Sequence, residues 1–219
     1  MEATIAKALR MNIARRWARQ ARKHAVALVI MLSVIVIGQI AIFTQRPLIV
    51  LTGNSHGYVR AAIALATQLD LMQSLRTPGY AVLLTVLFTF GGWADYLFIV
   101  IVQAVLVIVA LVEIYVLLWN VTRRRWLACC IASLLSANLY LLNWERSLLA
   151  GSLTFWAIVT ALLCFERFVH AMRVQSALAF ALGSVVLALI QPFFLFLPAL
   201  LLIALFVRVL LARQQIRRK

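Results

Sequence analysis

Long runs of apolar side chains fill most of this sequence and decide what it can fold into. A helix needs about 20 apolar residues to cross a hydrocarbon core of about 30 Å. Each run that meets or approaches this length is predicted to span a membrane, and the runs are residues 25–43, 96–118, 126–142, 147–165, 174–190 and 193–212. The sequence therefore predicts an all-α, polytopic membrane protein with about six transmembrane helices.

A further apolar run, residues 78–92, is too short to cross. At about 1.5 Å per residue, a helix of this length reaches only about 22 Å. Pro78 and Gly79 at one end and Gly91 and Gly92 at the other are typical of helix boundaries. We expect a short helix that enters or lies on the membrane without crossing it.

Basic residues between the apolar runs set the orientation. The chain has 21 Lys and Arg against 6 Asp and Glu, for a formal net charge of +15. An apolar share of 65% excludes a nucleic acid-binding protein, which carries such charge on a soluble, patterned surface. Lys and Arg in short loops stay on the cytoplasmic side. With six spans and both termini in the cytoplasm, all the basic residues fall on that side except Arg46, Arg60, Arg76 and Arg146.

This topology divides the chain into three parts. Residues 1–24 form a basic, amphipathic cytoplasmic segment on anionic lipid, residues 25–212 a single transmembrane domain, and residues 213–219 a basic cytoplasmic tail. We expect the first apolar run to be a signal anchor, because no small-residue cleavage site follows it. The external loop, residues 44–95, holds two interfacial helices. One is the short run described above, and the other has an apolar stripe of Val59, Ile63, Ala66, Leu69 and Met72.

Polar side chains at a sheltered mouth or at membrane depth often carry the function of a polytopic protein. On the external side, the candidates for a catalytic acid or base are Asp70, Asp95 and Glu145. A cation beside a helix that starts with proline is a ready anion site. The candidates for binding a substrate or its phosphate are Tyr58, Arg60, Arg76, Tyr80 and Arg146. No Cys or His cluster has the spacing of a metal site, and solvation of a loop is the plainer interpretation of each external residue.

Two polar residues stand out within the spans, namely Gln103 and Glu113. Glu113 lies toward the cytoplasmic end of its span. There we expect either a pairing with the arginines at 123–125 or a mechanistic role.

The external loop carries a motif in two pieces. Asn54, Ser55, Tyr58 and Ala62 have the order Asn-Ser-x-x-Tyr-x-x-x-Ala, and residues 76–80 read Arg-Thr-Pro-Gly-Tyr. This order resembles the first external loop of membrane glycosyltransferases of the GT-C fold, and it is similar to their bacterial branch related to protein O-mannosyltransferases and aminoarabinose transferases. The resemblance continues through Gln103, Asn138, residues 148–153 and the Gln191-Pro192 turn.

The resemblance implies an enzyme of the bacterial plasma (inner) membrane. Such enzymes move a sugar from a polyprenyl-phosphate carrier to an acceptor on the outer side. Members of the family usually continue with further spans, so the resemblance implies the N-terminal half of such a protein and a truncated relative.

Three charged positions of the family are neutral in this sequence. The first-loop aspartate falls on Asn54, the second external acid on Gly151, and the arginine of the Arg-Pro turn on Gln191. An amide cannot take a proton near neutral pH, and a glycine can neither ligate a metal nor serve as an acid. We therefore expect a catalytically degenerate protein that acts as a structural subunit of a membrane complex, or as half of a split enzyme completed by a partner chain.

Two alternatives stay open. In an active transferase, Arg76 with Arg60 or Arg146 would hold the carrier phosphate, and one of the three external acids would activate the acceptor. That alternative is the one that allows a cofactor, a divalent metal ion. A small transporter or lipid-handling protein would need a polar path through the bilayer, and Gln103 and Glu113 are the residues that offer one.

Overall fold

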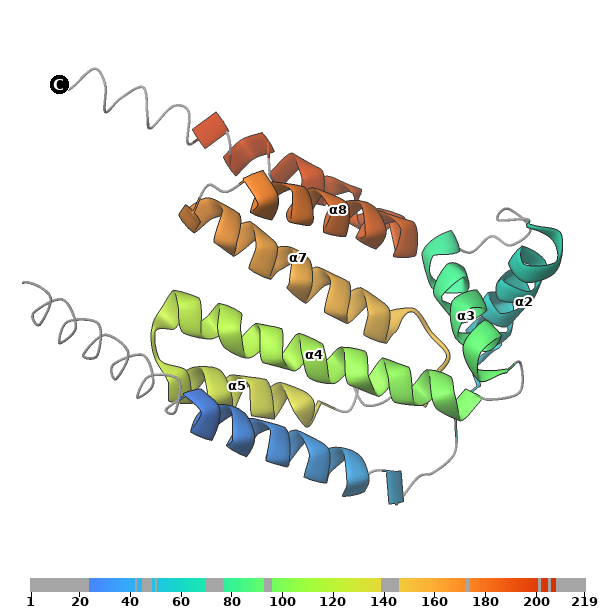
Figure 1. The fold of residues 1–219 in the computed structure, drawn as a ribbon, viewed down its shortest axis with the longest axis horizontal. Helices are drawn as coiled ribbons and strands as arrows, with labels where there is room; N and C mark the ends of the chain where they lie inside the picture. The colour runs from blue at the N-terminus through green and yellow to red at the C-terminus, as the bar shows by residue number, and fades with distance from the viewer. Residues whose placement is uncertain are drawn as a thin grey trace, which may run out of the picture.

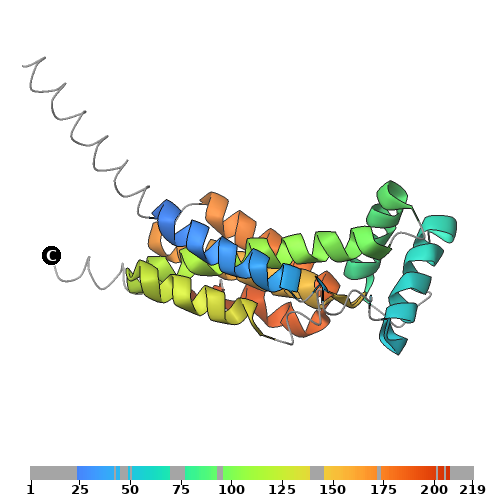
Figure 2. The same cartoon turned by 90° about the horizontal axis from the view of Figure 1, so that it is seen from below.

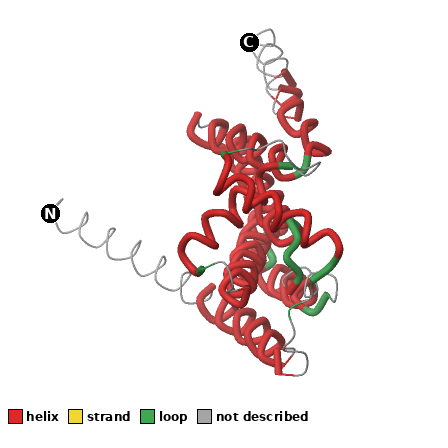
Figure 3. Tube along the Cα trace, turned by 90° about the vertical axis from the view of Figure 1, so that its right-hand side faces the viewer, coloured by secondary structure: helices red, strands yellow, loops and turns green. Residues whose placement is uncertain are grey.

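The described residues of the computed structural model are 24–41, 43–44, 49, 51–69, 77–92, 96–138, 146–171, 174–200, 202–204 and 206–207. Within these ranges the chain is helical apart from short loops and turns, with no β-strand (Figure 3). The all-α prediction is confirmed for this part of the chain. The predicted basic tail, and all of the N-terminal basic segment except His24, lie outside the described residues.

The helices follow one another in a simple order. The N-terminal helix His24–Ala41 comes first, and after it come α2 (Gly53–Gln68), α3 (Pro78–Gly91), α4 (Tyr96–Thr122), α5 (Arg125–Ser136), α7 (Gly151–Ala171), α8 (Val174–Ile190) and the short 3-10 helix η1 (Pro192–Phe196). Three of these, His24–Ala41, α4 and α7, are long and apolar enough to cross a membrane. Of the other predicted spans, α5 and α8 are apolar but shorter in the described chain.

The long helices lie side by side, and α2 and α3 pack across one end of them (Figures 1 and 2). The N-terminal helix, α5 and α8 run toward α2 and α3, whereas α4 and α7 run away (Figure 1). We call the end that carries α2 and α3 the capped end. The opposite end, where α4 stops at Thr122 and α5 starts at Arg125, is the arginine end.

The helices of the capped end start and stop where local signals predict. Thr52 caps α2 through a reciprocal pair of hydrogen bonds with Ser55, at 3.3 Å and 3.1 Å. Pro78 occupies the first turn of α3, where its missing N–H costs no hydrogen bond. The prediction of a short helix here is confirmed, and α3 lies at the end of the long helices (Figure 2).

The two helices of the cap contact each other through one face of α2. Tyr58, Ala61 and Ala62 are buried, and the Thr85 hydroxyl of α3 donates to the Ala62 carbonyl at 3.1 Å. Of the predicted apolar stripe, Ile63, Ala66 and Leu69 are exposed, whereas Val59 packs against the cluster at the capped end and Met72 lies outside the described residues. The exposed part of the stripe is free to meet a membrane surface.

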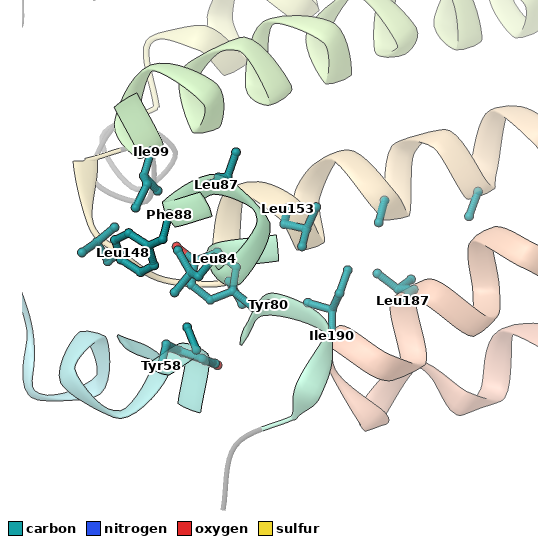
Figure 4. Packing of buried hydrophobic residues seen from close by; sticks show 14 of the residues in the cluster. Tyr58, Tyr80, Leu84, Leu87, Phe88, Ile99, Leu148, Leu153, Leu187 and Ile190 are labelled. Carbon is teal, nitrogen blue, oxygen red and sulfur yellow. The ribbon is translucent and has the colours of Figure 1, made fainter. Parts of the chain in front are cut away.

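Two apolar clusters hold the structure together, and α4 contributes to both. The cluster at the capped end joins α2, α3, α4, α7 and α8 around Tyr80, Leu84 and Leu187 (Figure 4). The other joins the N-terminal helix, α4 and α5. Small residues are completely buried where these helices meet, among them Ala27, Ala128 and Ala132. Small side chains let helix backbones approach closely, which is how membrane helices associate.

Candidate functional site

The motif at residues 77–80 docks the start of α3 against the end of α8. The Thr77 hydroxyl donates to the Ile190 carbonyl. A Cβ atom at Gly79 would lie 2.8 Å from the carbonyl carbon of Leu189 and 2.9 Å from its oxygen. Because both of these atoms belong to the backbone, only glycine fits this crossing. Thr77 and Gly79 therefore serve packing between helices.

Tyr80 links three parts of the chain at the centre of the capped end. Its side chain is completely buried, and its hydroxyl donates to Gln103 Oε1 of α4 at 2.5 Å. Gln103 Nε2 in turn donates to the Ser147 carbonyl, just before α7, at 2.9 Å. Both Gln103 and Ser147 have no exposed surface. The three residues form a buried polar connection in an otherwise apolar cluster.

The ring of Tyr58 packs against Tyr80 edge to face, with 4.9 Å between ring centroids (Figure 4). Burial, and then the neighbouring Tyr58, raise the pKa of the Tyr80 hydroxyl above its ordinary range. Tyr80 is therefore a protonated donor at physiological pH. The structure brings these two candidate residues together, inside the protein.

The predicted phosphate-binding arginines have different surroundings. Arg146 is buried directly before Ser147, and its guanidinium carbon lies 4.8 Å from the centre of the Phe43 ring. Arg60 is exposed on α2. Arg76 and the candidate acids Asp70, Asp95 and Glu145 lie outside the described residues.

The three neutral positions of the family pattern all belong to helix starts. Asn54 is exposed in the first turn of α2, Gly151 begins α7, and Gln191 precedes η1. None of them brings a charge to the capped end. Among the described residues, no group of three or more His, Cys, Asp or Glu could hold a metal ion.

A second set of polar contacts lies between α4 and α7, closer to the arginine end. The Thr160 hydroxyl donates to Glu113 Oε2 at 2.7 Å, and Asn120 Nδ2 donates to Glu166 Oε2 at 3.2 Å. His170 Nε2 lies 3.5 Å from Glu166 Oε1. Each carboxylate of the described chain is thus held by a polar side chain of the facing helix.

The expected pairing of Glu113 with the arginines at 123–125 is wrong for the described residues, where Glu113 accepts from Thr160. Ten residues of helix separate Glu113 from Arg123, a rise of about 15 Å, which is beyond side-chain reach. Thr160 lies on α7 and Glu113 on α4, and no sequence pattern indicates that these two residues meet. Sequence reasoning could find the polar residue but not its partner.

Comparisons with family models, curated proteins and solved structures find no match for the chain.

Proposed function

We propose that the chain is a non-catalytic membrane scaffold with a glycosyltransferase-like arrangement, which acts as a structural subunit of a membrane complex or as half of a split enzyme. In this proposal it crosses the bacterial plasma membrane six times, with both termini in the cytoplasm. The capped end faces outward, and the arginine end faces the cytoplasm.

The observation that carries the proposal is the burial of Tyr80. A side chain with no exposed surface, whose hydroxyl is used by Gln103, has neither room nor a donor for a substrate. Thr77 and Gly79 of the same motif contact the backbone of α8. The most specific piece of the resemblance therefore works as a packing element.

The distribution of charge supports the same proposal. Glu113 and Glu166, the carboxylates of the described chain, both lie between α4 and α7, away from the motif. The family positions for external acids hold Asn54 and Gly151. General acid–base catalysis needs a group that exchanges a proton near neutral pH, which an amide and a glycine cannot do.

The topology is supported by the directions of the helices. Successive long helices alternate in direction, and the three consecutive arginines of the α4–α5 turn lie at the opposite end from α2 and α3 (Figure 1). Basic residues gathered at one end match the rule for cytoplasmic loops.

Two measurements on the same material test the proposal. The tagged chain, extracted from its own membranes in mild detergent, should migrate with partner subunits in a fixed ratio. The purified protein should transfer no sugar from a polyprenyl-phosphate donor. Turnover by the wild type that Arg76→Ala abolishes would overturn the proposal, and so would extraction as a monomer.

The alternative of an active transferase has one observation in its favour. Arg146 is buried beside the Gln103 connection at the capped end, where a cation could hold a carrier phosphate. The turnover assay separates this alternative from the scaffold. Transfer that appears only in Asn54→Asp would identify a degenerate enzyme whose remaining parts are intact.

A further inference from the structure

The short turn between α4 and α5 carries three consecutive arginines. α4 ends at Thr122 and α5 begins at Arg125, so that Arg123 and Arg124 alone connect them. The Arg123 N–H donates to the Trp119 carbonyl at 2.8 Å, and the Arg124 N–H donates to the Thr122 hydroxyl at 3.2 Å. These bonds fix the backbone from which the arginine side chains project.

Aromatic rings position two of the three guanidinium groups. The guanidinium carbon of Arg123 lies 5.6 Å from the centre of the Trp119 ring, and that of Arg125 lies 5.4 Å from the Trp126 ring. Trp119 is itself held by His24 of the N-terminal helix, with 4.4 Å between ring centroids. A guanidinium over an aromatic ring keeps the planar fork of N–H donors that matches a phosphate.

The chain supplies no counter-ion for this turn in its described part. None of Arg123, Arg124 and Arg125 forms an ion pair with a described residue, and the nearby Glu166 is engaged by Asn120 and His170.

Apolar side chains surround the charges. Val121, Trp126 and Leu127 are 66%, 48% and 43% exposed, on either side of the turn. Tryptophan beside a cation at the end of membrane helices is typical of the headgroup level of a bilayer. A ligand that matches both the arginines and the apolar side chains has an anionic headgroup and an apolar tail.

We propose that the α4–α5 turn binds an anionic phospholipid. Arg123 and Arg125 hold the headgroup phosphate, Arg124 adds to the local positive potential, and Val121, Trp126 and Leu127 contact the acyl chains. This site goes beyond the scaffold role and does not depend on it, because the lipid binds to the chain alone.

The test uses the full chain in phosphatidylcholine vesicles that contain a minor fraction of spin-labelled phosphatidylglycerol. Electron paramagnetic resonance measures the motionally restricted lipid, and hence the preference for phosphatidylglycerol over phosphatidylcholine. Because each basic residue near a bilayer surface changes such a preference roughly fivefold, R123Q/R125Q should lose most of it. Arg167→Gln, at an exposed arginine of α7 outside the turn, is the control and should lose clearly less of the preference.

Further variants and conditions test whether the preference depends on the arginine side chains and on a lipid. Arg123→Lys/Arg125→Lys retains the charge but not the planar fork, and should keep part of the preference. High salt should weaken the wild-type preference, which checks the site without any substitution. An unchanged preference in R123Q/R125Q, or an equal loss in Arg167→Gln, would overturn the proposal. Full competition by inorganic phosphate would also overturn it, by showing a site for a soluble anion.

Discussion

The hydroxyl of Tyr80 and the amide oxygen of Gln103 are 2.5 Å apart inside the capped end, and neither residue has exposed surface. This contact joins α3, which is shorter than the candidate membrane spans, to α4, the longest apolar helix of the described chain. Gln103 Nε2 donates a second hydrogen bond to the Ser147 carbonyl. The position of the cap is thus specified by hydrogen bonds as well as by apolar packing.

Tyr80→Phe should destabilise the protein without changing its fold. The change removes one hydroxyl and leaves the buried Gln103 oxygen without this donor, which costs about 1–3 kcal/mol. Tyr96→Phe is the control, because Tyr96 is only half-buried and packs against the same cluster. Thermal unfolding in detergent measures both. Equal melting temperatures for the two variants would contradict the role given to the Tyr80 hydroxyl.

The same hydroxyl predicts a dependence of stability on alkaline pH. Burial, and then Tyr58, raise the pKa of Tyr80, so the folded state keeps a proton that the unfolded chain releases near pH 10. The stabilisation is fully present below that pH and is lost as pH rises above it. The stability difference between the wild type and Tyr80→Phe should therefore shrink above about pH 10. A difference that grows with pH in chemical denaturation would contradict this.

Gly79→Ala should loosen the contact between α3 and α8. The new methyl group would meet the Leu189 backbone at 2.8 Å, and overpacking of this kind costs about 1–3 kcal/mol. Gly53→Ala is the matched control, since no atom lies within 4 Å of a Cβ placed there. The melting temperature should fall for the first variant alone. Comparable losses in both would mean that the close crossing is not the cause.

Thr160→Val should weaken the association of α4 with α7. It removes the donor to Glu113 and keeps the side-chain volume. Hydrogen bonds between membrane helices contribute about 0.6–2 kcal/mol. Thr89→Val is the control, because Thr89 is exposed and bonds only within its own helix. A double-mutant cycle with Glu113→Ala, which removes the acceptor, would isolate the pair, and a coupling energy of zero would show that the hydrogen bond does not contribute to stability.

The proposed topology predicts opposite labelling at the two ends. In a background with Cys129, Cys130 and Cys164 replaced by Ala, a cysteine at Arg60 should react with an impermeant thiol reagent added outside intact cells. A cysteine at Arg124 should react only after the membrane is opened. Labelling of both cysteines from outside intact cells would show that the arginine end does not face the cytoplasm.

Local signals predicted the elements of the fold. Proline and paired glycines bounded the short helix that became α3, and three of the six apolar runs became helices long enough to cross a membrane. The extent of each crossing was harder to predict. Residues 126–142 were expected to form one span, whereas α5 is described as Arg125–Ser136. Length and hydropathy show where apolar sequence lies, but they do not mark the residue at which a helix ends.

Contacts between distant residues were beyond the sequence. Tyr58 and Tyr80 were both candidates for a substrate site, yet only the structure shows that they pack on each other. Glu113 was noted as a polar residue within a span, and its expected partner was wrong. The pairing with Thr160 depends on the rotation of α4 against α7, which many packed residues set together. A motif can therefore indicate which residues are special without indicating whether they serve chemistry or packing.

The bond from Thr77 to Ile190 has a consequence for how the protein is made. The two residues are 113 positions apart in the chain, and the acceptor is the last residue of α8. During synthesis α3 emerges from the ribosome long before α8 does, so the part of the docking surface of the cap that α8 supplies is missing until α8 has been made. Closure of the capped end is then a late step of biogenesis, and nascent chains arrested before Ile190 should keep α2 and α3 accessible to protease.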